Sequence, residues 1–91
     1  MTSQIEFICK NKKLVLDKDK VKIEGPFLDD TMQIDVVVKK NEKDVIDFFK
    51  RMEDTFCEIK SEKLEGMCHI YDVKISKKGE NYEITFSLSE I

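Results

Sequence analysis

The sequence has 91 residues, of which 41% are hydrophobic and 38% charged, and its 16 basic and 19 acidic residues give a net charge of −3. A chain of this length fits one domain, residues 1–91, with one modest core. Neither half is basic, which excludes the positive surface that general nucleic-acid-binding proteins use to hold phosphates, so we expect no direct contact with nucleic acid.

The first forty residues alternate between apolar and polar side chains and predict four strands separated by polar turns. Asn11–Lys12 and Asp17–Lys20 provide two of the turns. Gly25–Pro26 ends the third strand, because proline lacks a backbone donor and restricts the residue before it. The four predicted strands cover residues 5–10, 13–16, 21–24 and 31–40.

Residues Asn41–Cys57 have the period of an amphipathic helix. Asn41 is the expected N-cap, and the acidic residues after it favour the positive end of the helix dipole. We expect the helix to fade between Phe56 and Glu62. The apolar stripe consists of Val45, Phe49, Met52 and Phe56, widened by Ile46 and Phe48.

The last part of the chain returns to period two and predicts a hairpin. Its strands are Met67–Ser76 and Asn81–Glu90. Lys77–Glu80 joins them, with Gly79 suited to a left-handed position in a short bulged turn. The predicted element order is therefore β-β-β-β-α-β-β.

Strands with one apolar face and a helix with one apolar stripe need each other as cover. We therefore predict an α+β fold, with a mostly antiparallel sheet of five or six strands and one amphipathic helix packed on one face. Phe49 is expected near the centre of this contact. The sheet residues expected under the helix are Phe7, Ile34, Val36, Val73, Ile75, Ile84 and Phe86.

The side chains that perform catalysis do not form a recognisable pattern. A nucleophile needs a base beside it, and the single histidine, His69, follows Cys68, so a strand directs these two side chains to opposite faces. Paired zinc ligands, an EF-hand loop and a glycine-rich phosphate loop are also missing from the sequence. We expect no enzymatic activity, no catalytic residue, no metal and no cofactor.

The expected location of the protein is the cytoplasm. Three cysteines cannot all pair within one chain, so reduced thiols are expected. No secretory signal precedes the first alternating residues, and no apolar stretch approaches the roughly 20 residues of a membrane span. We therefore expect no contact with a membrane.

Several aliphatic residues are expected on the face of the sheet that the helix leaves open. Ile8, Val37 and Ile70, together with Val15, are predicted to lie there among charged and polar residues. An apolar spot with a charged rim fits a protein partner or a second copy of the chain. Incidental exposure and a second small core under the N-terminal hairpin are the alternatives.

An acidic group follows the predicted helix and consists of Glu58, Glu62 and Glu65. This group favours a basic protein as the partner. A small acidic α+β domain is similar in general character to phage-encoded inhibitors and immunity proteins, although no residue motif assigns the chain to one family.

Two functions fit these features. The first is a small protein-binding module, an inhibitor or immunity-type protein of the kind that phages and other mobile elements encode, which acts on a larger, basic protein. The second is a structural subunit or a homo-oligomer such as a dimer. It would assemble through the apolar outer face or through an edge strand, for which the final strand ending at Glu90–Ile91 is the candidate.

Overall fold

The computed structural model describes residues 4–25, 31–62 and 65–90, and within these ranges it contains seven strands, one α-helix and one 3-10 turn. In chain order the elements are β1 (Gln4–Cys9), β2 (Lys12–Asp17), η1 (Lys18–Lys20), β3 (Val21–Glu24), β4 (Thr31–Lys39), α1 (Lys43–Lys50), β5 (Thr55–Lys60), β6 (Glu65–Lys78) and β7 (Asn81–Glu90). The expected combination of a mostly antiparallel sheet and one helix is confirmed.

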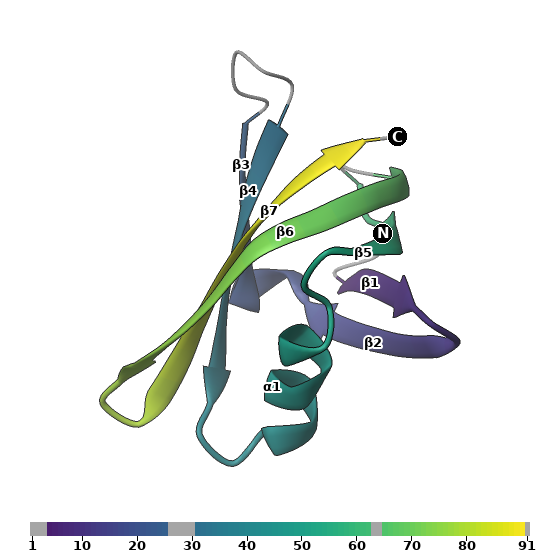
Figure 1. The fold of residues 1–91 in the computed structure, drawn as a ribbon. Coiled ribbons are helices and arrows are strands. Elements are labelled where there is room, and N and C mark those ends of the chain that lie inside the picture. The colour runs from purple at the N-terminus through teal and green to yellow at the C-terminus, as the bar shows by residue number, and fades with distance from the viewer. Residues whose placement is uncertain (1–3, 26–30, 63–64, 91) are drawn as a thin grey trace.

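All seven strands belong to one antiparallel sheet in the order β2-β1-β5-β6-β7-β4-β3. The sheet curves into a half-barrel, and α1 lies inside the curve (Figure 1). The two edge strands, β2 and β3, are consecutive in the chain, because η1 carries the chain from one edge to the other. The prediction that the final strand is an open edge is wrong, since β7 is paired with both β6 and β4.

Two tight turns form the hairpins at opposite ends of the chain. The β1–β2 turn consists of Lys10 and Asn11, whose φ angles are 47° and 68°, as a type I′ turn requires. It lies one residue before the turn expected at Asn11–Lys12. The β6–β7 turn consists of Gly79 and Glu80, and Gly79 has the expected positive φ of 61°. This loop has two residues, whereas the sequence predicted a four-residue connection.

The core lies between the concave face of the sheet and α1. Phe49 is fully buried at its centre, as expected, with its ring 5.5 Å from the rings of both Phe7 and Phe86. These edge-on and tilted contacts bring residues from the first strand, the helix and the last strand together. The eight-residue helix is too short to be stable alone, so this packing holds it in place.

The helix is much shorter than the sequence predicted. It begins at Lys43, after Glu42 at the N-cap position rather than Asn41, and it ends at Lys50. The segment expected to complete it forms β5, which raises the number of strands to seven and changes the element order. Thr55–Lys60 also alternates with period two, and pairing with both β1 and β6 decides between the two patterns.

A β-bulge reverses the faces of β6 along its length. Relative to β7, β6 has one extra residue just after Tyr71, and Asp72 in this bulge has a φ of 56°. One extra residue exchanges the inward and outward sides of a strand. Val73 and Ile75 pack on the core after the bulge, and before it Ile70 is fully buried. The prediction that Ile70 lies on the outer face is therefore wrong, because it assumed uninterrupted alternation.

Candidate functional site

The apolar residues predicted for the outer, convex face do not form one surface. Ile8 is half-buried on the outer face of β1, directly opposite Glu58 on β5. Val37 is 44% exposed on β4, and β6 and β7 separate that strand from β5. Because Ile70 belongs to the core, the structure does not bring Ile8, Val37 and Ile70 together.

The predicted acidic group is also divided. Glu58 lies on β5, where its neighbours across the sheet are Ile8 and Met67. Glu62 follows β5, and its Oε2 lies 3.1 Å from the Nζ atom of Lys18. Glu65 begins β6 opposite a lysine of β5. Since two of the three glutamates lie beside lysines, they do not make a continuous negative surface.

An aromatic row lies on the outer face of β5 and β6. Phe56 on β5 is directly opposite His69 on β6, and their ring centroids are 5.3 Å apart. Tyr71, two residues further along β6, stacks on His69 at 5.6 Å. Ring separations of this size are those of favourable aromatic pairs. Phe56 nevertheless keeps 60% of its surface exposed, so the row is open to solvent.

Two aliphatic side chains extend this row into a patch. Met67 lies two residues before His69 on the same face of β6 and is 50% exposed. Ile8 lies one strand beyond Glu58 in the same line across the sheet. Single exposed apolar residues are ordinary, whereas neighbouring ones mark interaction sites. We call the five side chains the outer patch: Ile8, Phe56, Met67, His69 and Tyr71.

The turn between α1 and β5 holds one side of the outer patch in place. Asp54 has a φ of 58°, and its Oδ1 lies 2.8 Å from Nε2 of His69, which orients the imidazole ring. The preceding Glu53 accepts a hydrogen bond of 3.0 Å from the backbone N–H of Val73, next to the bulge in β6. Thr55 donates its hydroxyl proton to the carbonyl of Met52. The turn is therefore fixed to both strands that carry the aromatic row.

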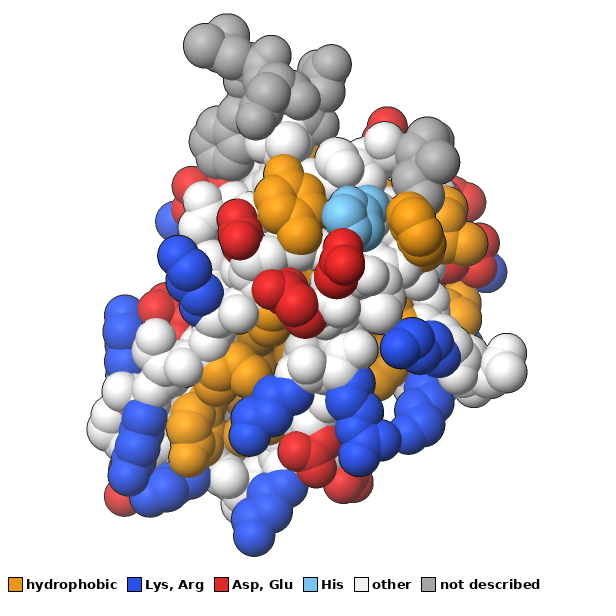
Figure 2. All heavy atoms as spheres, in the orientation of Figure 1, with side chains coloured by type: hydrophobic (Ala, Val, Ile, Leu, Met, Phe, Trp, Pro, Cys, Tyr) orange, Lys and Arg blue, Asp and Glu red, His pale blue; other side chains and the backbone are white. Residues whose placement is uncertain are grey.

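The surface beside the outer patch, next to the turn between α1 and β5, is acidic. Figure 2 shows the single histidine between hydrophobic side chains, with acidic side chains gathered beside it. Glu53 and Asp54 belong to this acidic rim, and the side chain of Asp54 is 83% exposed. Lysine and arginine side chains gather in the lower part of the same view, toward α1. The patch therefore combines aromatic faces with carboxylates.

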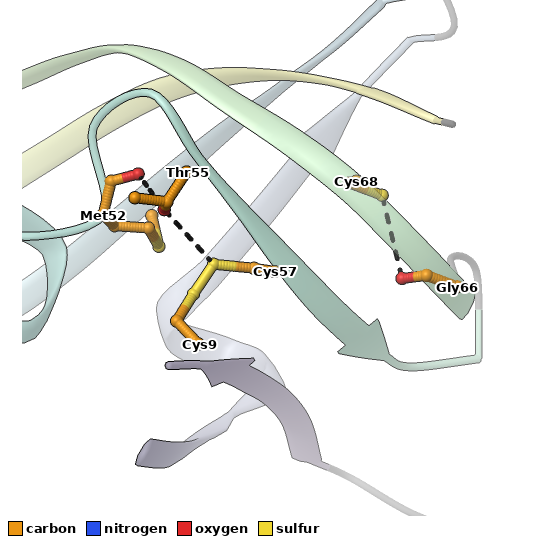
Figure 3. The surroundings of a disulfide bond; sticks show 6 residues. All are labelled: Cys9, Met52, Thr55, Cys57, Gly66 and Cys68. Atoms are coloured by element: carbon orange, nitrogen blue, oxygen red, sulfur yellow. Dashed lines mark hydrogen bonds between the residues drawn. A yellow bond between two sulfur atoms is a disulfide. The ribbon is translucent and has the colours of Figure 1, made fainter. Parts of the chain in front are cut away.

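The three cysteines lie in one line across β1, β5 and β6, on the core side of the sheet. Cys9 and Cys57 form a disulfide bond with their Cα atoms 4.7 Å apart, so the prediction that all three thiols are reduced is wrong (Figure 3). Cys68 is opposite Cys57 in the register, is fully buried and donates its S–H weakly to the carbonyl of Gly66. Burial, with a smaller effect of the Glu90 carboxylate, raises the pKa of the Cys68 thiol. Cys68 is therefore a poor nucleophile.

The residues considered for catalysis and metal binding do not come together. His69 lies on the outer face and Cys68 on the inner face, as the alternation predicted. Within the described ranges, no three His, Cys, Asp or Glu side chains converge to hold a metal ion. The helix that these ranges contain is also too short to cross a membrane.

Comparison with known proteins identifies no relative. The chain matches no protein-family model, and searches among curated proteins and among solved structures also find no match. The function is therefore inferred from the site itself.

Sequence reasoning missed the outer patch because it assigned Phe56 to the apolar stripe of the helix. The signal that identifies its true position is local. From Thr55 to Lys60, Cys57 and Ile59 alternate with Phe56 and two charged residues, which is the pattern of a strand with one covered face. In that reading Phe56 is the large apolar residue on the polar side, and therefore the candidate for a binding residue.

Proposed function

We propose that the protein is a small non-enzymatic binding module, of the inhibitor or immunity type, that docks on a larger basic protein through the outer patch. The observation that carries the proposal is the exposure of Phe56 in a row of stacked rings that the fold does not need to cover. Aromatic residues in a fixed position, surrounded by polar groups, are the usual anchors of a protein interface.

The chemistry of the patch favours arginine on the partner. A guanidinium group stacks on aromatic faces and also pairs with carboxylates. The aromatic row offers the faces, while Asp54 beside His69 and Glu58 beside Met67 offer the carboxylates. An arginine-bearing surface would therefore find both kinds of contact within one region. The net charge of −3 would also favour its approach.

Capture of a partner from the native host tests this proposal. We expect the immobilised protein to retain a basic protein at low salt and to release it as the salt concentration rises, because the charge contacts are screened. The double variant Phe56→Thr and Met67→Thr should lose this protein. A matched variant, Val37→Thr, changes an exposed aliphatic residue on the far side of the same face and should retain it.

The captured protein must then bind in purified form. Truncating an interface anchor costs at least about 2 kcal/mol, so the double variant should weaken binding by roughly thirtyfold or more in calorimetry. Equal binding by the double variant and the unchanged protein would show that the outer patch is not the docking surface. Capture of acidic proteins alone would contradict the expected charge.

The second function, assembly of identical copies, is favoured by one observation on the sheet edge. Val15 is 39% exposed on edge strand β2, which can accept another strand along its open side. Size-exclusion chromatography with light scattering separates the two functions. A stable dimer that Val15→Lys dissociates would favour assembly, whereas a monomer at high concentration would leave the binding module as the proposal.

The cytoplasmic location expected from the sequence remains part of the proposal. In that location the Cys9–Cys57 bond would form only under oxidising conditions, because cytosolic thiol pools keep most cysteines reduced.

A further inference from the structure

A groove of about 830 Å³ separates the β1–β2 hairpin from α1. Its apolar lining includes Phe48 and Met52 from the helical side and Cys9 at the end of β1. The groove is therefore distinct from the outer patch, which lies on the opposite face of the sheet. Its most reactive lining residue is Cys9, because Cys9 contributes one sulfur of the disulfide bond.

Positive charge predominates around this groove. Lys10 and Lys12 lie at the tip of the hairpin, and Arg51 follows the last turn of α1. Lys13 also lines the groove, but its Nζ pairs with Glu6 at 2.7 Å. Two aspartates of α1 reduce the positive charge without cancelling it, since four cationic residues contribute to the same lining. A small anionic molecule is the ligand that this charge would attract.

The two cysteines of the disulfide are not equally exposed. Cys57 is completely buried, whereas Cys9 is 8% exposed and lines the groove. A thiolate attacks a disulfide sulfur in line with the bond that breaks. Strand order places β1 between β5 and β2, so Cys9 is the cysteine of the pair on the side of the hairpin and Cys57 the one on the side of β6. Because the groove borders the hairpin and its lining includes Cys9, we expect attack at the Cys9 sulfur.

We propose that the groove admits small anionic thiols and that Cys9 is the site at which they form a mixed disulfide. The thiolate of the incoming molecule forms a bond to the Cys9 sulfur, and the Cys9–Cys57 bond breaks. Cys57 leaves with the electron pair as a thiolate and takes a proton from water. A second molecule of the same thiol then attacks the sulfur of the first, which releases Cys9 as a thiol and the small molecule as its symmetrical disulfide. The incoming thiol is the reductant, so the steps balance.

This reaction opens the crosslink between β1 and β5. The buried thiol of Cys68, whose pKa is raised, is a poor nucleophile and is not expected to attack the mixed disulfide. The assignment does not depend on the proposed partner, because the groove and the outer patch share no residue.

Peptide mapping locates the adduct directly. Cleavage after lysine and arginine separates the three cysteines into residues 1–10, 52–60 and 64–74. The oxidised protein is treated briefly with reduced glutathione, a peptide thiol with two carboxylates, then quenched in acid with N-ethylmaleimide and digested. We expect the glutathione adduct on peptide 1–10 and the maleimide label on peptide 52–60. An adduct mainly on peptide 52–60 or 64–74, or an oxidised protein without a bond between peptides 1–10 and 52–60, would overturn the proposal.

The charge dependence of the rate tests the role of the groove. Glutathione is compared with cysteamine, which is cationic, and each rate is divided by the rate of the same thiol with a small neutral disulfide. The normalised preference for glutathione should be on the order of tenfold at low salt. It should disappear in the variant Lys12→Glu with Arg51→Glu and rise in Asp47→Lys. Lys77→Glu, a single charge reversal at an exposed position of β6 that does not line the groove, serves as the control. A preference that is absent, or that Lys77→Glu abolishes equally, would contradict attraction by the groove.

Discussion

The outer face of the sheet has two halves that differ in composition although one sheet carries both. On β7 and β4 the outward residues are almost all polar, with Val37 as an exposed exception. On β1, β5 and β6 the outward residues include the five of the outer patch together with charged residues such as Glu6 and Glu58. The polar outward residues are Gln33, Asp35, Glu83, Thr85, Ser87 and Ser89. Since the polar half shows what this sheet needs in contact with water, the aromatic half carries more apolar surface than folding requires.

The polar half also satisfies its own groups. Thr85 donates its hydroxyl proton to Asp35 across β7 and β4 at 3.0 Å. The Nζ atom of Lys78 lies 2.8 Å from Oε1 of Glu83, and this hydrogen-bonded ion pair raises the pKa of the lysine. In the aromatic half, the Asp54 carboxylate orients the ring of His69, while Phe56 stays 60% exposed. This difference between the halves is the physical basis of the proposed docking surface.

The largest expected effect is the difference in stability between a variant of Phe49, in the core, and a variant of Phe56, on the outer face. Phe49→Ala should lower the free energy of unfolding by about 3–5 kcal/mol, because it leaves a cavity among buried rings. Phe56→Thr should change it by less than about 0.5 kcal/mol, because Phe56 is mostly exposed and threonine suits a strand. Urea unfolding of both variants measures the contrast. A large loss of stability in Phe56→Thr would mean that the outer patch supports the fold.

The bulge that ends the aromatic half should give an intermediate effect. Asp72→Val should cost about 1–2 kcal/mol, because the positive φ at this position strains a β-branched residue. Asp72→Gly relieves that strain and should change stability by less than about 1 kcal/mol. Lys74→Val, two residues later in regular strand, is the matched control and should cost nothing measurable. Equal costs for the two valine variants in thermal unfolding would show that the backbone at the bulge is not strained.

The smallest expected effect lies outside the patch, where Glu42 joins the end of β4 to the start of α1. A hydrogen bond from the Lys39 backbone N–H, helped by Lys20, lowers the pKa of Glu42 below its ordinary value of 4.5. A lowered pKa stabilises the fold above pH 4.5, and this contribution is lost as the pH falls through the lowered pKa. Glu42→Gln should therefore lose less than about 1 kcal/mol at pH 7, because the pair is exposed.

The dependence of this loss on pH provides the check. The difference between Glu42→Gln and the unchanged protein should shrink to nothing in strongly acidic solution. A difference that stays constant from pH 7 to pH 2 would show that the charge of Glu42 is not its cause.

The sequence was sufficient for the hairpins, the burial of Phe49 and the mostly antiparallel sheet, because each depends on local alternation or on one helical stripe. It was insufficient where two periods overlap. Phe56 continues the helical spacing of Phe49 and Met52, yet it belongs to a strand that exists because β1 and β6 need a neighbour between them. The alternation from Thr55 to Lys60 fits a strand, but only the pairing with β1 and β6 decides between that pattern and the helical spacing.

The candidate site was harder to predict than the fold. Ile8 lies on the outer face as expected, but the bulge at Asp72 turned Ile70 inward, and Glu58, expected after the helix, lies on β5. The pairing of Cys9 with Cys57 likewise depends on the register between two strands that lie far apart in the sequence. Register, bulges and distant pairs all arise from tertiary packing.

The order of the strands has a consequence for how fast the protein folds. Four neighbouring strand pairs form between segments close in the chain, but β1 must find β5 and β4 must find β7 across long stretches of sequence. Such distant pairings lose the conformational entropy of a large loop before any stabilising contact forms. Small domains that depend on them therefore fold in milliseconds to seconds rather than microseconds. The N-terminal hairpin can form early, yet it has no place to dock until β5 lies beside β6.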